Sequence, residues 1–220
     1  AFQILRQHLN DPEQCLLFHS RFVLSDRKTI ENSVLDIFGK DGGNTDRAGK
    51  VLIATQVFQE SLDADADVMI SDICPIDDLI QRAGRLHRHT RDNQGRYQAG
   101  ITDSRNNPML YVHAPTYTDV PKGDWLSQDF RNTQYVYRSA GRLWLGLRKL
   151  LELKAIRMPS EARELIEAVY SDEALAQIPQ SLINQESELF AEERLKAAKA
   201  KSNLLQWQTY GYCDRSAKAW

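Results

Sequence analysis

Cysteine is scarce in this sequence, and long hydrophobic runs are missing from it. The three cysteines, Cys15, Cys74 and Cys213, are too few and too scattered for a disulfide framework or a paired zinc site. We therefore expect buried or incidental thiols in a reducing compartment. No apolar run is long enough to cross a bilayer and no signal-peptide pattern occurs, which predicts a cytoplasmic protein without a membrane partner. Because the sequence does not begin with Met, we expect a piece of a larger protein.

Net charge is also low, at −2 from 28 basic and 30 acidic side chains. This balance argues against a protein coated in basic residues for bulk nucleic-acid binding, so any anion site must be built locally. One stretch offers such a site: DDLIQRAGRLHRHTR, residues 77–91, holds four arginines and two histidines. A chain of 220 residues with 42% hydrophobic content can build a core beside it.

The first half of the sequence alternates short apolar runs with helical patterns. Four of these runs are continuous, which is typical of parallel strands buried on both faces. They are CLLFHS (15–20), VLIAT (51–55), DVMISD (67–72) and MLYVHA (109–114). Ser25 is placed to cap a helix after the first run. The inward positions of that helix are Ile30, Val34, Leu35 and Phe38. The alternation predicts an α/β domain with a mostly parallel sheet over residues 1–115.

The second half changes to a helical pattern. The Pro and Gly of TYTDVPKGDW predict a linker over residues 116–133. Apolar residues recur at helical spacing in 134–153, another helix opens at Pro159 and Ser160, and 186–206 continues as a charged amphipathic helix. We expect residues 134–220 to form an all-helical extension that is itself incomplete.

The arginine cluster has the pattern of an amphipathic helix. If residues 77–88 are helical, the outward face carries Gln81, Arg85 and Arg88. The opposite face carries Leu79, Ala83 and Leu86. The two outward guanidiniums suit phosphate, because each presents planar donors and stays charged. We expect the helix to loosen near LHRH, residues 86–89.

Three stretches together resemble the superfamily 2 helicases. QRAGRLHR resembles motif VI, Q-R-x-G-R-x-x-R, VLIATQVFQESLDADAD resembles motif V, and LLFHSRFVLSDR resembles motif IV. In these forms the motifs are similar to the CRISPR-associated helicase-nuclease of type I interference, which acts after the Cascade surveillance complex has opened an R-loop. The resemblance is strong over about 15–115. A later stretch, AIRMPSEARELIEAVY, resembles the helical part that follows in the type I-E branch of these helicase-nucleases.

This resemblance implies that residues 1–115 are a second RecA-like domain, which closes an ATP site against a first one. Arg85 and Arg88 would then be arginine fingers for the transferred phosphoryl group. Gln81 would contact the γ-phosphate side, and Arg82 would support it. Asp63 would reach the ATP ribose or couple motif V to motif VI.

The resemblance also implies contacts to the phosphates of one DNA strand. These contacts would come from the ends of two strands, where open α/β sheets place ligands. His19, Ser20 and Arg21 follow the first strand, and Thr55 and Gln56 follow the second. Phosphate contacts of this kind fix position and carry no sequence information. Single-stranded DNA is therefore the expected nucleic-acid partner.

Several expected signatures are missing from the sequence. It contains no G-x-x-x-x-G-K-[ST] phosphate loop, no D-E-x-[DH] strand and no H-D nuclease signature. The lysine that cradles ATP, the Mg²⁺ ligand and the nuclease metals are therefore expected on a first RecA-like domain and an HD nuclease domain of the same protein. No metal is expected in this chain, because His87 and His89 lie on different helix faces and DADAD (63–67) lacks the Gly and Glu of a calcium loop.

The predicted function is that of a fragment of an ATP-dependent DNA helicase that cooperates with a nuclease to unwind and degrade foreign DNA in CRISPR interference. Alone, the fragment is expected to be inactive, and Cascade is the expected partner complex. Two alternatives stay open at this point. One is a fragment of a generic superfamily 2 DNA or RNA helicase. The other is a non-catalytic interaction module that keeps the α/β fold and uses its arginines to dock a protein or an anionic partner.

Overall fold

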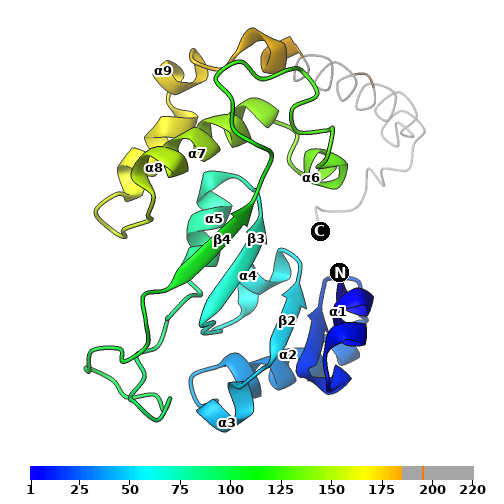
Figure 1. Cartoon of the computed structure of the whole chain (residues 1–220), viewed down its shortest axis with the longest axis vertical. Coiled ribbons are helices and arrows are strands. Elements are labelled where there is room, and N and C mark those ends of the chain that lie inside the picture. The colour runs from blue at the N-terminus through cyan, green and yellow to red at the C-terminus, as the bar shows by residue number, and fades with distance from the viewer. Residues whose placement is uncertain (185–194, 196–220) are drawn as a thin grey trace, which may run out of the picture.

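The computed structural model of the protein describes residues 1–184 and 195. Strand and helix alternate as far as His113, and the described chain is helical from Arg131 onward (Figure 1). In Figure 1 the late helices lie at one end of the molecule and the first strands and helices lie at the other. This is the α/β architecture with a helical extension that the sequence predicts.

The four predicted strands are present and pair in parallel, two by two. β1 (Cys15–Phe18) pairs with β2 (Val51–Ala54), and β3 (Val68–Asp72) pairs with β4 (Met109–His113). Within the described residues these are two separate two-stranded sheets rather than one continuous sheet. Because Phe18 lies opposite Ala54, the residues that follow β1 and β2 emerge side by side at one edge.

Helices precede, connect and cover these strands. Around the first sheet they are α1 (Phe2–His8), a short 3₁₀ helix (Pro12–Gln14), α2 (Leu24–Phe38) and α3 (Asn44–Arg47). Next to motifs V and VI they are α4 (Val57–Ser61) and α5 (Ile76–Ala83). After β4 they are α6 (Arg131–Val136), α7 (Ala140–Leu153), α8 (Ala162–Tyr170) and α9 (Asp172–Leu175).

Helix α2 has the predicted inward face but a different start. Val34 and Phe38 are buried, and Ile30 and Leu35 pack against the same core. The prediction that Ser25 caps this helix is wrong. The N-cap position belongs to Val23, whose extended backbone begins the helix at Leu24, and the Ser25 hydroxyl donates instead to Asp26. The apolar spacing therefore located the helix better than the capping residue did.

The buried residues form two clusters. The smaller one lies between the first sheet and its helices, and its members are Phe18, Val34, Phe38, Val57, Leu62 and Ala64. The larger one joins α5 to the helical extension, with Leu79, Leu145 and Leu165 each at most 1% exposed. Full burial of such a side chain contributes about 1.5–3 kcal/mol. The extension thus packs on the back of α5 and shares its core.

The interpretation of all four strands as buried on both faces is wrong for the second sheet. One face of β3 and β4 packs against the larger cluster through Leu110 and Val112. On the other face Ile70 is 78% and Tyr111 is 53% exposed. The continuous apolar run predicts cover on both sides, but within the described residues only one side has it.

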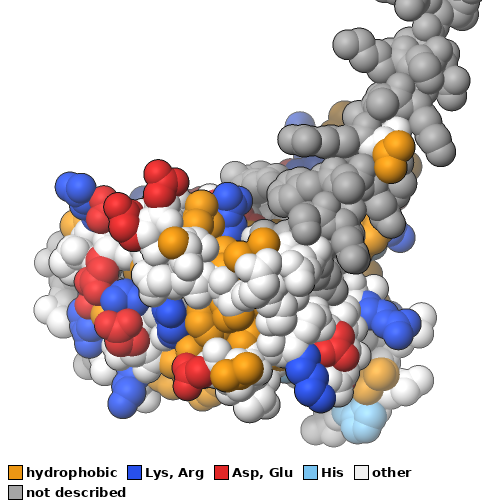
Figure 2. All heavy atoms as spheres, turned by 90° about the horizontal axis from the view of Figure 1, so that it is seen from above, with side chains coloured by type: hydrophobic (Ala, Val, Ile, Leu, Met, Phe, Trp, Pro, Cys, Tyr) orange, Lys and Arg blue, Asp and Glu red, His pale blue; other side chains and the backbone are white. Residues whose placement is uncertain are grey.

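The helical extension also departs from the prediction in detail. The helix expected over 134–153 is interrupted, because Ser139 accepts a hydrogen bond from the Arg142 N–H and starts α7 as a new helix. α8 begins at Ala162 rather than at Pro159. The helix predicted over 186–206 lies outside the described residues, apart from residue 195. Figure 2 shows Lys/Arg and Asp/Glu side chains intermixed on the face seen from this end, so its coloured part has no continuous basic track.

Two further predictions concern the cysteines and membrane-spanning helices. Cys15 and Cys74 are buried free thiols, and burial raises the pKa of Cys74 to about 11. Cys213 lies outside the described residues. In the described part of the chain, no helix is long and apolar enough to span a membrane.

Candidate functional site

The helix that carries the arginine cluster ends earlier than predicted. α5 stops at Ala83, and the backbone then tightens, with Leu86 N–H donating to the Ala83 carbonyl at 3.0 Å. Ala66 next pairs with this turn, donating to the Arg85 carbonyl at 2.8 Å and accepting from the His87 N–H at 3.1 Å. This bridge to the chain before β3 is what stops the helix. Arg85 and Arg88 therefore lie in the turn and not on one helical face.

Arg85 points at α4 and keeps one donor free. Its Nη2 donates to the Gln59 carbonyl at 2.7 Å, while its Nε is buried and has no hydrogen-bond partner within the described part of the chain. Burial lowers the pKa of Arg85, and the charge of Arg88 lowers it further. A buried guanidinium N–H without a partner is uncommon in folded proteins.

Arg88 and Asp63 form an exposed ion pair that joins motif VI to motif V. The Arg88 Nε donates to Asp63, and the side chains are 41% and 55% exposed. His89 Nε2 lies 3.3 Å from the other Asp63 oxygen. Partial burial acts to raise the pKa of Asp63, but the Arg88 hydrogen bond and the His89 charge outweigh it, so that pKa is lowered. Asp63 thus links the motif V segment to the motif VI segment.

Arg82 and Gln81 lie in different surroundings on α5. Gln81 is exposed. Arg82 is half-buried, and its donors reach three elements: Gln59 Oε1 at 2.7 Å, Ser71 Oγ at 2.7 Å and the Tyr137 hydroxyl at 3.0 Å. Arg82 therefore braces α5 against its neighbours, which suits the supporting role predicted for it.

Gln59 organises this site, and sequence reasoning missed it. It is 4% exposed, and its amide donates to Asp78 Oδ1 at 2.7 Å while its Oε1 accepts from Arg82. Its backbone carbonyl also accepts from Arg85. A buried glutamine with every group in use fixes α4 against α5. The only sequence signal was a polar residue on the inward side of VFQES.

The residues predicted to contact DNA lie together at one edge of the first sheet. The Thr55 N–H donates to the Phe18 carbonyl at 3.1 Å, which sets Thr55 and Gln56 beside the turn after β1. In that turn His19 stacks on Phe22 at 4.1 Å and accepts from the Arg21 N–H, which leaves Ser20 and Arg21 exposed. Parallel pairing thus brings the two predicted groups side by side.

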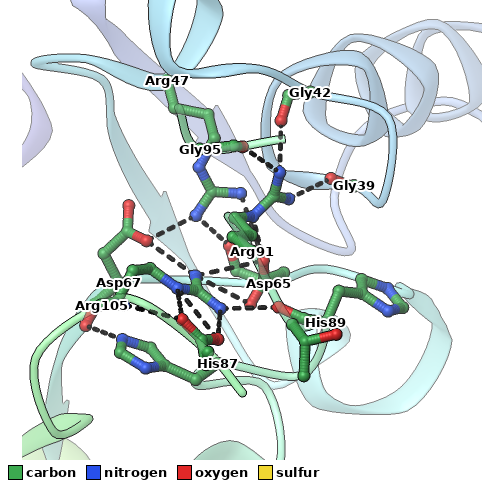
Figure 3. Close-up of polar contacts among 12 residues, drawn as sticks. Gly39, Gly42, Arg47, Asp65, Asp67, His87, His89, Arg91, Gly95 and Arg105 are labelled. Carbon is green, nitrogen blue, oxygen red and sulfur yellow. Dashed lines mark hydrogen bonds and ion pairs between the residues drawn. The ribbon is translucent and has the colours of Figure 1, made fainter. Parts of the chain in front are cut away.

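The fourth arginine of the cluster, Arg91, is buried in an ionic network (Figure 3). Arg91 is 1% exposed, and its Nε donates to Asp65, itself 0% exposed, at 2.7 Å. Its other donors satisfy the carbonyls of Gly39, Gly42 and Gly95. Arg47 and Arg105 also pair with Asp65, and both reach Asp67.

Three chain segments therefore converge on the Asp65 carboxylate. Residues 39–47, 63–67 and 87–105 are tied together through the arginines and aspartates labelled in Figure 3. The Arg105 hydrogen bond lowers the pKa of Asp103, at the edge of this network, to about 2. The carboxylates of DADAD are thus used as arginine partners. No group of His, Cys, Asp and Glu side chains in the described residues could hold a metal ion.

Comparison with known proteins finds a matching family model and similar proteins. A family model for the C-terminal part of the CRISPR-associated nuclease/helicase Cas3 matches residues 1–91. The CRISPR-associated endonuclease/helicase Cas3 of Escherichia coli K12 is 30% identical over 212 residues, which cover 94% of this chain and 21% of that protein.

Solved structures agree with the sequence match. The structure of T. fusca Cas3-ATP matches with a TM-score of 0.60 and 27% identity, covering 91% of this chain and 21% of that one. A chain in a CRISPR RNA-guided surveillance complex before nicking matches with a TM-score of 0.57 and 29% identity, covering 92% of this chain and 23% of its own length. The chain therefore spans about a fifth of the length of these relatives.

Proposed function

Because the chain belongs to the family of CRISPR-associated Cas3 nuclease/helicases, we propose that it supplies arginine fingers and DNA-backbone contacts to an ATP-dependent DNA helicase. The chain spans about a fifth of its relatives' length, so the activity of the whole protein is part of the proposal. That activity is the unwinding and degradation of foreign DNA. The family match favours this motor over a generic superfamily 2 helicase.

The Arg85 side chain is the observation that carries the proposal. Its Nη2 is held by the Gln59 carbonyl at 2.7 Å, and after burial the nearby charge of Arg88 is the next cause that lowers its pKa. Two guanidiniums held near each other repel, and a phosphate group between them removes that repulsion. Arg88 can turn toward such a group by leaving Asp63, because their ion pair is exposed and therefore weak.

The chain's own residues fit the phosphates of ATP and not its metal ion. Arg85 and Arg88 would hold the γ-phosphate, with Gln81 exposed beside them on α5. The carboxylates nearest to them are paired with arginine or histidine. We place the Mg²⁺ ligands, the phosphate loop and the nuclease metals on a first RecA-like domain and an HD nuclease domain elsewhere in the protein. Alone, this chain is then expected not to hydrolyse ATP.

The DNA track is proposed at the edge where β1 and β2 end. Ser20, Arg21 and Thr55 are exposed there, and Gln56 begins α4 next to them. One arginine and a few hydroxyl and amide groups suit a single phosphate backbone without base contacts. A Cascade-type surveillance complex, as in the matched pre-nicking assembly, is the proposed source of the opened strand.

Salt dependence tests the DNA track. We expect the chain to bind single-stranded DNA weakly, without sequence preference, and with an affinity that falls as salt rises. Arg21→Ala removes one phosphate contact, which lowers the slope of log K against log salt by about 0.7 for a single strand. Fluorescence anisotropy with a labelled oligonucleotide measures both quantities.

The matched control for Arg21→Ala is Arg163→Ala. Arg163 is 87% exposed on α8, far along the chain from the β1 and β2 ends, and within the described residues its one ion pair is with Glu167, four positions later. Arg163→Ala changes the net charge by the same amount as Arg21→Ala. We expect it to leave the slope of log K against log salt unchanged. Equal slopes for the two variants, or tight binding that persists at high salt, would rule out the proposed track.

A further inference from the structure

One tyrosine hydroxyl joins the helical extension to both motif V and motif VI. Tyr137 follows α6, and its oxygen accepts from Gln56 Nε2 at 2.8 Å and from Arg82 Nη2 at 3.0 Å. Gln56 belongs to the proposed DNA track, and Arg82 lies on the helix that leads to the proposed fingers. The chain separation is 81 residues for the first contact and 55 for the second. Neither contact follows from local structure.

The same arginine extends this contact toward the fingers. Arg82 also donates to Gln59 Oε1 at 2.7 Å, and the Gln59 carbonyl accepts from Arg85 at 2.7 Å. A continuous path of hydrogen bonds therefore runs from Gln56 through Tyr137, Arg82 and Gln59 to Arg85. Each step is within ordinary hydrogen-bonding distance. Tyr137 is the only member of this path that comes from the helical extension.

We propose that Tyr137 is a positioning residue that couples DNA contact at Gln56 to the ATP-side residues Arg82 and Arg85. One phenol oxygen has two lone pairs, and here both face donors from the two motifs. Arg82 is a charged donor, so its bond is the stronger of the two. When a DNA phosphate fixes Gln56, the shared oxygen fixes Arg82 with it. This proposal rests on the proposed function and adds a residue that none of the helicase motifs contains.

The surroundings of Tyr137 keep the hydroxyl in the form that this role needs. Burial raises the pKa of Tyr137 to about 12, although the Gln56 hydrogen bond and the Arg82 charge act to lower it. The phenol therefore stays protonated at neutral pH. Asp78, which also holds Gln59, faces the same hydroxyl and adds to the rise. The ring is half-buried, so loss of the oxygen alone leaves its packing in place.

The experiment is Tyr137→Phe in the full-length protein, with ATP turnover measured with and without single-stranded DNA. We expect the ratio of DNA-stimulated to basal turnover to fall by about tenfold, because a hydrogen bond to a charged group corresponds to roughly that factor. Basal turnover and melting temperature are expected to stay unchanged, since Arg82 keeps its bonds to Gln59 and Ser71. A residue with only a structural role would lower stability and basal turnover together.

Tyr135→Phe is the matched control. Tyr135 lies in α6 two positions earlier and is 83% exposed, and among the described residues its hydroxyl has no hydrogen bond to either motif, so Tyr135→Phe removes the same atom without breaking such a contact. A double-mutant cycle gives a second readout. In a protein that already carries Tyr137→Phe, the further change Gln56→Ala is expected to lower the ratio of DNA-stimulated to basal turnover only slightly.

The outcomes separate this inference from the proposed function. If Tyr137→Phe keeps the stimulation ratio of Tyr135→Phe while Arg85→Ala abolishes turnover, the coupling role is wrong and the arginine fingers stand. If Tyr137→Phe lowers basal and stimulated turnover equally, it acts structurally and the inference is also wrong. If Arg85→Ala keeps normal turnover, the proposed function fails, and the inference fails with it.

Discussion

Replacing Arg85 or Arg88 by alanine in the full-length protein is expected to lower ATP turnover by about a thousandfold or more. Each change removes a positive charge from the transferred phosphoryl group at the moment when negative charge develops on it. ATP-driven unwinding and long-range DNA degradation should nearly vanish with it. Cutting of single-stranded DNA should survive, because we place the nuclease metals on another domain. Steady-state ATPase and nuclease assays on the same preparations measure both.

Two further substitutions separate a lost finger from a lost fold. Arg96→Ala removes an arginine that is 68% exposed and that, in the described part of the chain, forms an ion pair with Asp92 alone, and it is expected to leave turnover unchanged. Leu86→Asp places a charge at a side chain that is only 9% exposed and should unfold or aggregate the protein. If the two finger variants behave like either of these, the arginines are not fingers and the docking alternative regains its place.

The Asp65→Asn substitution is expected to destabilise the fold by about 3–5 kcal/mol, which for a chain of this size lowers the melting temperature by about 6–20 °C. The amide keeps the shape of the carboxylate and removes its charge. Arg91, at 1% exposed, and Arg47, at 6%, would then be left as buried cations with one fewer anion. Thermal or urea unfolding followed by circular dichroism measures the effect.

Glu167→Gln is the control for Asp65→Asn. Glu167→Gln also replaces an acid by its amide, but in an exposed ion pair with Arg163. Such exposed pairs contribute about 0–1 kcal/mol to the free energy of unfolding. Similar melting temperatures for the two variants would mean that the network around Asp65 does not hold together the three chain segments that converge on it. A large loss for Asp65→Asn alone is the expected result.

The sequence was most informative where a pattern is local. Four continuous apolar runs predicted the four strands, because buried parallel strands need no polar alternation. Their parallel pairing followed from the helices between them, which also placed the ends of β1 and β2 at one edge. The exposure of Ile70 and Tyr111 could not be predicted, because a continuous apolar run does not show whether one face of a strand is covered or both.

The sequence was least informative about which side chains meet. Four arginines in one short stretch look alike, yet Arg82, Arg85, Arg88 and Arg91 have four different sets of partners. Arg91 was counted in the cluster without a role of its own, and it is buried on Asp65. Its partner lies 26 residues away and belongs to a loop that suggested, superficially, a calcium site. Charge partners at this separation leave no periodic signal.

Similar reasons explain the misjudged helix end and the missed residues. The helical pattern continues through Arg88, but the bridge to Ala66 ends the helix at Ala83 because the backbone gains hydrogen bonds there. Gln59 lies within the motif V stretch but was given no role there, and Tyr137 lies outside all three motifs. Their importance comes from contacts with Arg82, and only the folded chain brings these three residues together.

Single-turnover hydrolysis is the most direct test of whether Arg85 acts as an arginine finger. The full-length protein and its Arg85→Ala variant are each mixed with ATP and single-stranded DNA, with the protein in excess over ATP. ATP binding and phosphate formation are then followed separately. We expect the variant to bind ATP but to form phosphate about a thousandfold more slowly, because the arginine acts on the phosphoryl group in the transition state. Phosphate formation at the unsubstituted rate by ATP-bound Arg85→Ala protein would contradict this expectation.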